Sequence, residues 1–286
     1  MSQQLVAVVS DSTCDIPDPV LAELGIPLAP VHIQAEDKSY RDRLDMSIEE
    51  ANSIMLAGKI RLTTSAATAA DWLEAYEKAL PLASELVAFS ISPLLSATYA
   101  GANTGAELLD GGSVTVINAQ SILASMGLVV RQCARAAQGG QSRADVVALA
   151  EHLLPRVRMV VASMYRSFAK AGGRYQGDGV PEGEDGLPIF RIWEKGWKEI
   201  DRADTRQASI DRLFHWMDSD LKEVGYVPGN PLLVAVDHFA CLEEATAIHR
   251  RIQDLYHPQE LDLWQIGATA AVHLGPGTVG MAYLPL

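Results

Sequence analysis

The sequence predicts an α/β protein of two domains, a Rossmann-like parallel-sheet domain followed by an α+β domain with a mixed or antiparallel sheet. The chain has 286 residues, which at about 150 residues per domain is enough for two hydrophobic cores. Short apolar runs alternate with helical patterns over residues 1–160, whereas turn and hairpin signals interrupt this alternation over residues 161–286. We therefore place the domain boundary near residue 160.

Strand and helix signals follow one another in the first domain. Three helix starts carry a capping box, in which Ser47, Thr68 or Ser142 is followed three residues later by an acid. Glycines at 25, 58 and 139–140 are placed to end helices. The predicted strands are 5–9, 26–34, 86–91 and 114–117, and the predicted helices are 17–24, 47–58, 121–138 and three that begin at 68, near 96 and at 142. This spacing predicts a largely parallel sheet that is covered on both faces.

The second domain has a different pattern. Residues 160–162 predict a strand, and 176–186 predict an acidic, glycine-rich loop. Residues 189–193 and 197–200 flank a short turn and predict a hairpin. Helices are predicted at 207–224 and 242–255, a strand at 232–236, and a strand-like end from 261 onward that includes 270–272 and is interrupted by Gly-Pro-Gly at 275–277.

The composition argues against several classes of protein. The chain has 23 Lys and Arg against 36 Asp and Glu, so its formal net charge is -13. Nucleic acids and anionic lipid surfaces both repel such a charge. No run approaches about eighteen apolar residues, and the first residues lack the basic start and apolar core of a signal peptide. We therefore expect a cytoplasmic protein that does not insert into a membrane.

The three cysteines are Cys14, Cys133 and Cys241, and they lie far apart in the chain. An odd number at such spacing fits neither a disulfide framework nor a zinc ribbon. We expect reduced thiols that pack as small apolar side chains.

Polar side chains gather where strands of the first domain end. Ser-Asp-Ser-Thr at 10–13 follows the first strand, Ser90 and Ser92 end another, and Asn118 ends a third. Open parallel sheets bind ligands outside these carboxyl ends, and a helix start there offers unpaired N–H groups to an anion. Ser96, at such a helix start, is a candidate anion donor as well as a cap.

Two residues of the second domain are further candidates. Arg174 follows two glycines on a tight turn, and His273 precedes Gly-Pro-Gly at the end of the strand-like residues 270–272. Each also fits a purely structural role, because an arginine can cap helix carbonyls and an imidazole can be satisfied within a core.

The sequence lacks the common catalytic motifs. It contains no G-x-x-x-x-G-K-[ST] phosphate loop, no G-x-S-x-G elbow and no H-E-x-x-H zinc motif. One G-x-G-x-x-G occurs at 275–280, but too few residues follow it for the helix and second strand of a dinucleotide-binding unit. We expect its glycines to let the backbone approach a neighbouring group closely.

Six segments in a fixed order carry a family resemblance. They are Val-Ser-Asp-Ser-Thr-Cys-Asp-Ile at 9–16, Thr-Ser at 64–65 with Trp-Leu-Glu-Ala-Tyr-Glu at 72–77, Ile-Ser-Pro-Leu-Leu-Ser-Ala-Thr-Tyr at 91–99, Ser-Met-Gly-Leu at 125–128, Ala-Gly-Gly-Arg at 171–174 and Val-His-Leu-Gly-Pro-Gly at 272–277. Together they resemble the DegV family, the bacterial fatty-acid-binding proteins that serve fatty acid kinase. The segments span essentially the whole chain.

The resemblance implies a two-domain α/β fold that buries one long-chain fatty acid, or a similar acyl amphiphile, in an apolar tunnel between the domains. It implies a partner such as fatty acid kinase, and no catalytic residue, metal or cofactor in this chain besides the bound fatty acid. The positions that match the family's headgroup site are Thr64, Ser65, Ser96, Arg174 and His273.

These residue types suit a buried carboxylate. Such a group is costly to bury unless it is paired or hydrogen-bonded, and hydroxyl donors, a helix start and an imidazole supply those bonds without a lysine. The chain departs from the family at Asp204-Thr205, where the family has Arg-Thr on the side thought to meet the kinase, and Arg202 or Arg206 is a candidate substitute.

Two alternatives stay open. An acyl or phosphoryl hydrolase would use Ser96 or Ser65 as nucleophile with His273 and Asp11, although the chain has no nucleophile elbow.

The other alternative is a ligand-free interaction protein of the same fold, with a pocket that side chains fill. Pro93 and Leu94 stand where the family usually has Ser-Gly, and Ala97 stands where it has glycine. These bulkier residues would narrow the entrance of the site.

Overall fold

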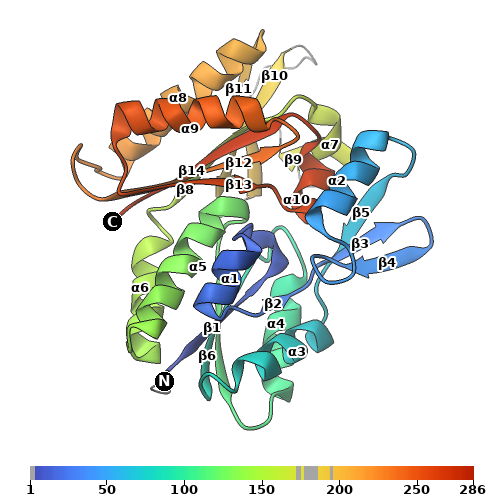
Figure 1. The fold of residues 1–286 in the computed structure, drawn as a ribbon, viewed down its shortest axis with the longest axis vertical. Helices are drawn as coiled ribbons and strands as arrows, with labels where there is room; N and C mark the ends of the chain where they lie inside the picture. The colour runs from blue at the N-terminus through green and yellow to red at the C-terminus, as the bar shows by residue number, and fades with distance from the viewer. Residues whose placement is uncertain (1–3, 172–174, 177–185, 194–195) are drawn as a thin grey trace.

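The computed structural model describes residues 4–171, 175–176, 186–193 and 196–286. Within these residues the chain forms a parallel sheet, a larger mixed sheet and a small antiparallel sheet. The two larger sheets are separated by helices and carry further helices on their outer faces (Figure 1). We call the parallel sheet with its helices the first lobe, and the mixed sheet with its helices the second lobe. The predicted fold class is therefore confirmed.

The sheet of the first lobe has four parallel strands in the order β2-β1-β6-β7. β1 is buried along its whole length, and so is β6 after its first residue, which explains why their sequences are continuous apolar runs. The strands are β1 (Ala7–Asp11), β2 (Leu28–Ala29), β6 (Glu85–Ser90) and β7 (Ser113–Asn118).

Helices cover both faces of this sheet. α3 and α4 pack on one face around the buried rings of Trp72 and Tyr76, and α1, α5 and α6 pack on the other. The short 3-10 helix η1 (Ser12–Cys14) follows β1 directly. The helices are α1 (Asp18–Leu24), α3 (Ala69–Ala79), α4 (Thr98–Leu108), α5 (Leu123–Gln138) and α6 (Arg143–Leu153).

The sheet of the second lobe has the order β13-β12-β14-β8-β10-β11-β9. The β12–β13 and β11–β9 pairs are parallel and the other pairs are antiparallel, so the sheet is mixed. The chain enters it at β8. The strands are β8 (Arg158–Ala162), β9 (Tyr175–Gln176), β10 (Leu187–Trp193), β11 (Gly196–Ala203), β12 (Leu232–Phe239), β13 (Glu260–Gln265) and β14 (Thr278–Pro285).

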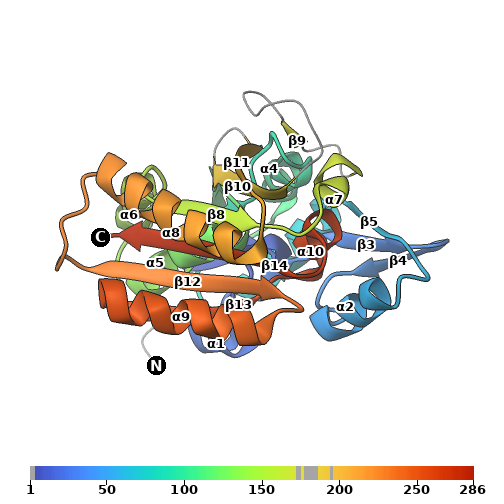
Figure 2. The same ribbon diagram turned by 90° about the horizontal axis from the view of Figure 1, so that it is seen from above.

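Two helices cover the outer face of the second sheet. α8 (Arg206–Glu223) and α9 (Leu242–Tyr256) lie over the strands in Figure 2 and close a core of their own with them. The inner face packs against α5 instead.

The small sheet, in the order β4-β3-β5, extends from the first lobe. Its apolar side packs against α2 (Ile48–Ala57) and α10 (Ala268–Leu274), and α7 (Arg166–Ala171) lies beside α10. Because α10 follows the β13 strand of the second lobe, it carries second-lobe residues onto a first-lobe sheet. The strands are β3 (His32–Ala35), β4 (Lys38–Arg41) and β5 (Leu62–Ser65).

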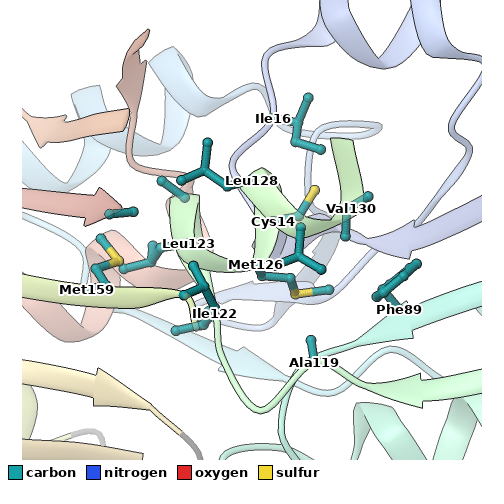
Figure 3. Packing of buried hydrophobic residues seen from close by; sticks show 14 of the residues in the cluster. Cys14, Ile16, Phe89, Ala119, Ile122, Leu123, Met126, Leu128, Val130 and Met159 are labelled. Atoms are coloured by element: carbon teal, nitrogen blue, oxygen red, sulfur yellow. The ribbon is translucent and has the colours of Figure 1, made fainter. Parts of the chain in front are cut away.

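α5 is the helix that both lobes share. It contacts β1 and η1 of the first lobe and β12 and β14 of the second. Its buried side chains belong to one hydrophobic cluster that continues from one lobe into the other. Figure 3 shows Met126 and Val130 beside Cys14, and Leu123 beside Met159 of the second lobe. Each large apolar side chain buried in this way contributes about 1.5–3 kcal/mol.

Several local predictions are confirmed. The capping boxes at Ser47, Thr68 and Ser142 are all present. Gly25 and Gly58 end their helices in the left-handed conformation. The predicted hairpin is the β10–β11 pair, and the three cysteines are free thiols. Most of the acidic loop predicted at 176–186 lies outside the described residues.

The strand predicted over 26–34 is wrong in part, because two short strands occupy it. β2 joins the parallel sheet and β3 joins the small sheet, and Pro30, which has no N–H to donate to a ladder, lies between them. The sequence analysis did not predict β4 and β5. The helix predicted near Ser96 begins at Thr98.

The strand-like interpretation of 270–272 is also wrong, because these residues lie in α10. Three of the seven residues of α10 are alanine, the residue with the highest helix propensity. A short run of apolar residues does not distinguish the period of a helix from that of a strand, which is why the sequence pattern was ambiguous. The strands of this region are β13, which precedes α10 in the chain, and β14, which follows it.

The glycines after α10 do approach their neighbours closely, as predicted. Gly275 and Gly277 have φ of +79° and +77°. A Cβ at Gly275 would lie 2.8 Å from the Phe168 ring, and one at Gly277 would lie 2.7 Å from Met164. The G-x-G-x-x-G therefore shapes a turn within the second lobe.

The close packing of α5 gives a stability prediction. A Cβ at Gly127 would lie 2.3 Å from the carbonyl oxygen of Cys14 and 2.7 Å from the Trp264 ring. Although alanine favours a helix by about 1 kcal/mol, we expect Gly127→Ala to lower the free energy of unfolding by roughly 1–3 kcal/mol, because backbone must move. Urea denaturation measures this.

Gly139→Ala is the matched control, because Gly139 is exposed at the end of the same helix and its Cβ would meet nothing nearer than 3.3 Å. Equal stability of the two variants would contradict the close approach of α5 to η1.

Candidate functional site

Thr64 and His273 meet at the junction of the two lobes. Thr64 Oγ1 on β5 lies 2.9 Å from His273 Nε2 on α10. The imidazole is only 9% exposed and stands edge-on to the Trp197 ring, with the ring centroids 6.2 Å apart. A hydroxyl and an imidazole from distant parts of the chain thus form a polar pair that is largely shielded from water.

This pair lines a small cavity of about 30 Å³. Ser65 and Ser96 line the same cavity, so the structure brings together four of the five predicted site residues. Two more hydroxyl-bearing residues and five apolar residues complete the described wall: Thr13, Thr269, Val31, Ile91, Leu95, Ile122 and Trp197.

The cavity lies outside the carboxyl ends of two parallel strands, where the sequence placed a ligand site. Thr13 follows β1 and Ile91 follows β6. Asp11 connects these two strand ends, because its carboxylate accepts hydrogen bonds from the N–H and hydroxyl of Thr13 and, at 2.8 Å, from the N–H of Ile91. Burial raises the pKa of Asp11, and these hydrogen bonds oppose the rise.

Ser65 is held by a chain of side-chain hydrogen bonds across the small sheet. Gln34 Nε2 donates to Ser65 Oγ at 3.0 Å and to Ser39 Oγ at 2.9 Å. Ser39 contacts one ring nitrogen of His32, and the other lies 2.9 Å from Asp71. Ser65 is therefore positioned from the solvent side of the sheet.

The N-cap of α4 is Ala97, which makes no side-chain cap hydrogen bond, so the capping role predicted for Ser96 is wrong. Ser96 lies one residue before this cap. Its hydroxyl oxygen accepts the N–H of Thr98 at 3.2 Å and lies 2.9 Å from Thr98 Oγ1. Ser96 thus contributes to the wall of the cavity next to the start of α4.

The residues expected to narrow the entrance are exposed and are not among the residues that line the cavity. Leu94 is 66% exposed, and Pro93 and Ala97 are also exposed. The neighbouring Leu95 is buried and lines the cavity instead.

The geometry does not assemble the hydrolase that the sequence left open. His273 bonds to Thr64, whereas Ser65 bonds to Gln34 and Ser96 bonds to Thr98. The Asp11 carboxylate is occupied by Thr13 and Ile91. A Ser-His-Asp relay requires direct hydrogen bonds between its members.

No described residue of the cavity wall is a lysine or arginine. Arg174, the fifth predicted site residue, lies outside the described residues. In the described part of the chain, no cluster of three or more His, Cys, Asp or Glu could hold a metal ion, and no helix is long and apolar enough to cross a bilayer.

The sequence analysis missed several residues of the cavity wall. Trp197 was predicted as the first residue of a hairpin strand, and Thr269, Leu95 and Ile122 carried no local signal. Their positions depend on pairing between distant strands, which a single sequence does not display.

The fold and site define a two-lobed α/β protein with a hydroxyl- and imidazole-lined cavity where its lobes meet. The sequence profile described as "Uncharacterised protein, DegV family" matches residues 5–286. The chain therefore belongs to the DegV family.

Individual relatives agree with this assignment. A DegV domain-containing protein of Deinococcus radiodurans is 28% identical over 285 residues, which cover 98% of this chain and 99% of the relative. DegV of Bacillus subtilis, described as a fatty acid binding protein, matches with a TM-score of 0.87 at 21% identity over 99% of this chain and all of that one. A stearic acid-binding protein of Eubacterium ventriosum matches with a TM-score of 0.88 at 20% identity over 98% of each chain.

The Thr64–His273 contact predicts a measurable stability effect. Thr64→Val keeps the shape of the side chain but removes the hydroxyl, and one net hydrogen bond is worth about 0.5–1.5 kcal/mol. We expect urea denaturation to show a loss of about 1 kcal/mol in the free energy of unfolding.

Thr63→Val is the matched control, because Thr63 is exposed and points to the other face of the same strand. It should change the stability by less than about 0.5 kcal/mol. The contact contributes nothing if both variants lose the same amount.

Proposed function

We propose that this chain binds a long-chain fatty acid, or a similar acyl amphiphile, between its lobes and presents the carboxylate to a partner such as a fatty acid kinase. The observation that carries the proposal is the convergence of Thr64 and His273 with Ser65 and Ser96 at one cavity whose other walls are mainly apolar. Family members described as fatty-acid-binding proteins support it.

The polar end of the cavity suits a carboxylate headgroup. The hydroxyl of Thr64 and a ring N–H of His273 can both donate to carboxylate oxygens, and Ser65 and Ser96 line the same cavity. Hydrogen bonds to an ionised acceptor are worth about 1.5–3 kcal/mol each, so this end fixes the orientation of the ligand.

The acyl chain supplies most of the affinity in this proposal. Each buried methylene contributes about 0.8 kcal/mol, so a sixteen-carbon chain contributes on the order of 10 kcal/mol before ordering costs. The cavity of about 30 Å³ has room for only one or two water molecules. Binding therefore requires the apolar wall to move.

Four apolar residues of that wall lie outside helices and strands, and Leu95 and Ile122 are two of them. Leu95 is on the loop between β6 and α4, and Ile122 is on the turn before α5. We propose that the acyl chain displaces these two side chains and enters the hydrophobic cluster between the lobes.

In this proposal the chain is a cytoplasmic carrier that needs no cofactor, and the partner carries out the catalysis. The arginines near the family's kinase-facing position already have partners. Arg206 bonds to Glu244 and to the Gly277 carbonyl, and Arg202 bonds to the buried Glu199. A kinase that recognises a positive charge at this position must compete with these contacts for the arginine side chain.

A ligand-free interaction protein is the second candidate, and the small volume of the cavity favours it. The two candidates differ in one respect that can be measured directly. The carrier opens for an acyl chain, whereas the interaction protein stays closed.

Lipid extraction and binding test the proposal. We expect organic extracts of the purified protein to contain a fatty acid by mass spectrometry, and the delipidated protein to bind palmitate or oleate. Because Trp197 lines the cavity, bound dibromostearic acid should quench part of the tryptophan fluorescence, and Trp197→Phe should lose that part.

The headgroup contacts are tested by comparing a fatty acid with the fatty alcohol of equal length. Thr64→Val and His273→Ala should each weaken palmitate binding by roughly 10–100-fold, the equivalent of one charge-assisted hydrogen bond, and should affect hexadecanol less. Thr63→Val should leave both affinities unchanged. A protein that carries no lipid and binds neither fatty acid would rule out the proposal.

A further inference from the structure

Two buried carboxylates cross between the lobes in a reciprocal arrangement. Asp15, which follows η1 in the first lobe, accepts the N–H of Gly267 in the second lobe at 3.1 Å. Asp237, on β12 of the second lobe, accepts the N–H of Ala124 in the first lobe at 2.9 Å. A carboxylate of each lobe thus accepts a backbone N–H at the start of a helix in the other lobe.

The two helix starts carry walls of the cavity. Gly267 caps α10, the helix of Thr269 and His273. Ala124 lies in the first turn of α5, two residues after Ile122. The Asp15 and Asp237 carboxylates therefore position cavity-lining side chains without touching the cavity themselves.

The arrangement depends on close approach. A Cβ at Gly267 would lie 2.7 Å from the Asp15 oxygen that accepts its N–H. Gly267 has φ of -63° and ψ of 153°, a conformation that any residue can adopt. The need for glycine here comes from the carboxylate and not from the backbone.

Both residues are buried, Asp15 with 3% exposure and Asp237 with none, and each carboxylate has one oxygen without a hydrogen-bond partner among the described residues, Asp15 Oδ2 and Asp237 Oδ1. An ionised carboxylate in such surroundings is costly, so the group tends to keep a proton. Burial raises the pKa of Asp237 to about 7. Burial, reinforced by repulsion from Asp237, raises the pKa of Asp15 well above its usual range.

Other charges act on this pair. Asp15 is also influenced by Arg43, which favours its ionised form, and by Asp42, which opposes it. Asp237 is influenced by Asp262 of the neighbouring strand β13, whose own charge is paired with Arg131.

The turn that leads into α5 is held in an unfavourable conformation. Gln120 and Leu123 have φ of +53° and +62°, in the left-handed region that non-glycine residues avoid. Leu123 is also fully buried. Strained residues of this kind persist only where surrounding contacts hold them, and the adjacent Asp237–Ala124 hydrogen bond is one such contact.

We propose that Asp15 and Asp237 are positioning residues that, while the pair retains a proton, clasp the two lobes closed over the cavity, and that loss of the proton loosens the clasp. Ionisation of both groups adds repulsion between them and leaves a charged carboxylate in each lobe with one oxygen that has no partner among the described residues. Water reaches these oxygens only if the lobes separate. The part of this inference that concerns ligand release rests on the proposed function, whereas the clasp itself does not.

The sign of the pH dependence follows from where the proton is held. The closed form keeps a proton that the open or unfolded form releases near the usual aspartate pKa of 3.8, so closure weakens as pH rises from there through the raised pKa values of Asp237, about 7, and of Asp15. For one proton, the closing equilibrium falls by up to about tenfold per pH unit within this window.

Amide hydrogen exchange of the ligand-free protein tests the clasp. In the wild type, the protection factors of the Ala124 and Gly267 amides should fall as pH rises from 5 to 7. Asp237→Asn and Asp15→Asn keep an acceptor oxygen without a charge, so each should flatten this profile. Asp110→Asn, which removes an exposed carboxylate far from either helix start in the chain, should leave it unchanged.

Gly267→Ala tests the close approach without altering any charge, and should lower the protection of both amides at pH 5. Protection that does not change with pH in the wild type would overturn the proposal, and this result does not depend on whether any variant folds. So would an unaltered pH profile in Asp15→Asn and Asp237→Asn variants that retain the native circular dichroism spectrum.

Release of cis-parinaric acid tests the consequence for a ligand. Its dissociation rate should rise between pH 5 and pH 7 in the wild type and change less in Asp237→Asn. Failure to bind this probe would count against the proposed function. The amide exchange experiment would still test whether Asp15 and Asp237 hold the lobes together. Binding with the same pH profile in both proteins would contradict the clasp alone.

Discussion

The packing of α5 between the two large sheets is the constraint on which the rest of the structure depends. A helix that is buried on nearly all sides needs apolar residues around its whole circumference, and α5 is buried at every residue from Leu123 to Val130, nearly all of them apolar. One hydrophobic cluster therefore serves both lobes. Neither lobe can bury its half of this cluster without the other, so the two sheets behave as parts of a single core.

The candidate site is a consequence of this shared core. The carboxyl ends of β1 and β6 point to the junction, and α10 crosses from the second lobe to meet the small sheet there. Hydroxyls and an imidazole gather where the strands end, while the interior behind them is apolar. The cavity thus has one polar end and apolar surroundings. This arrangement matches an amphiphile, which has a polar headgroup and an apolar chain.

Local chemistry allowed much of the fold to be predicted. The capping boxes at Ser47 and Thr68 each lie within four residues, so the sequence displays them in full. Ser96 and His273 were singled out from their neighbours along the chain, whereas Thr64 was named only through the family resemblance. Its strand, β5, exists because it pairs with β3, and its partner His273 lies 209 positions away. Contacts of that range follow from tertiary packing, which short sequence windows do not encode.

The position of β14 has a consequence for how the molecule is assembled. β14 follows every other described strand in the chain, yet it lies in the middle of the second sheet, between β12 and β8. During translation, α5 emerges well before the strand that covers its second-lobe side. The nascent first lobe must therefore expose the apolar side of α5 until β14 has been synthesised. This long-range pairing slows folding, and the exposed apolar surface gives a chaperone a site to bind.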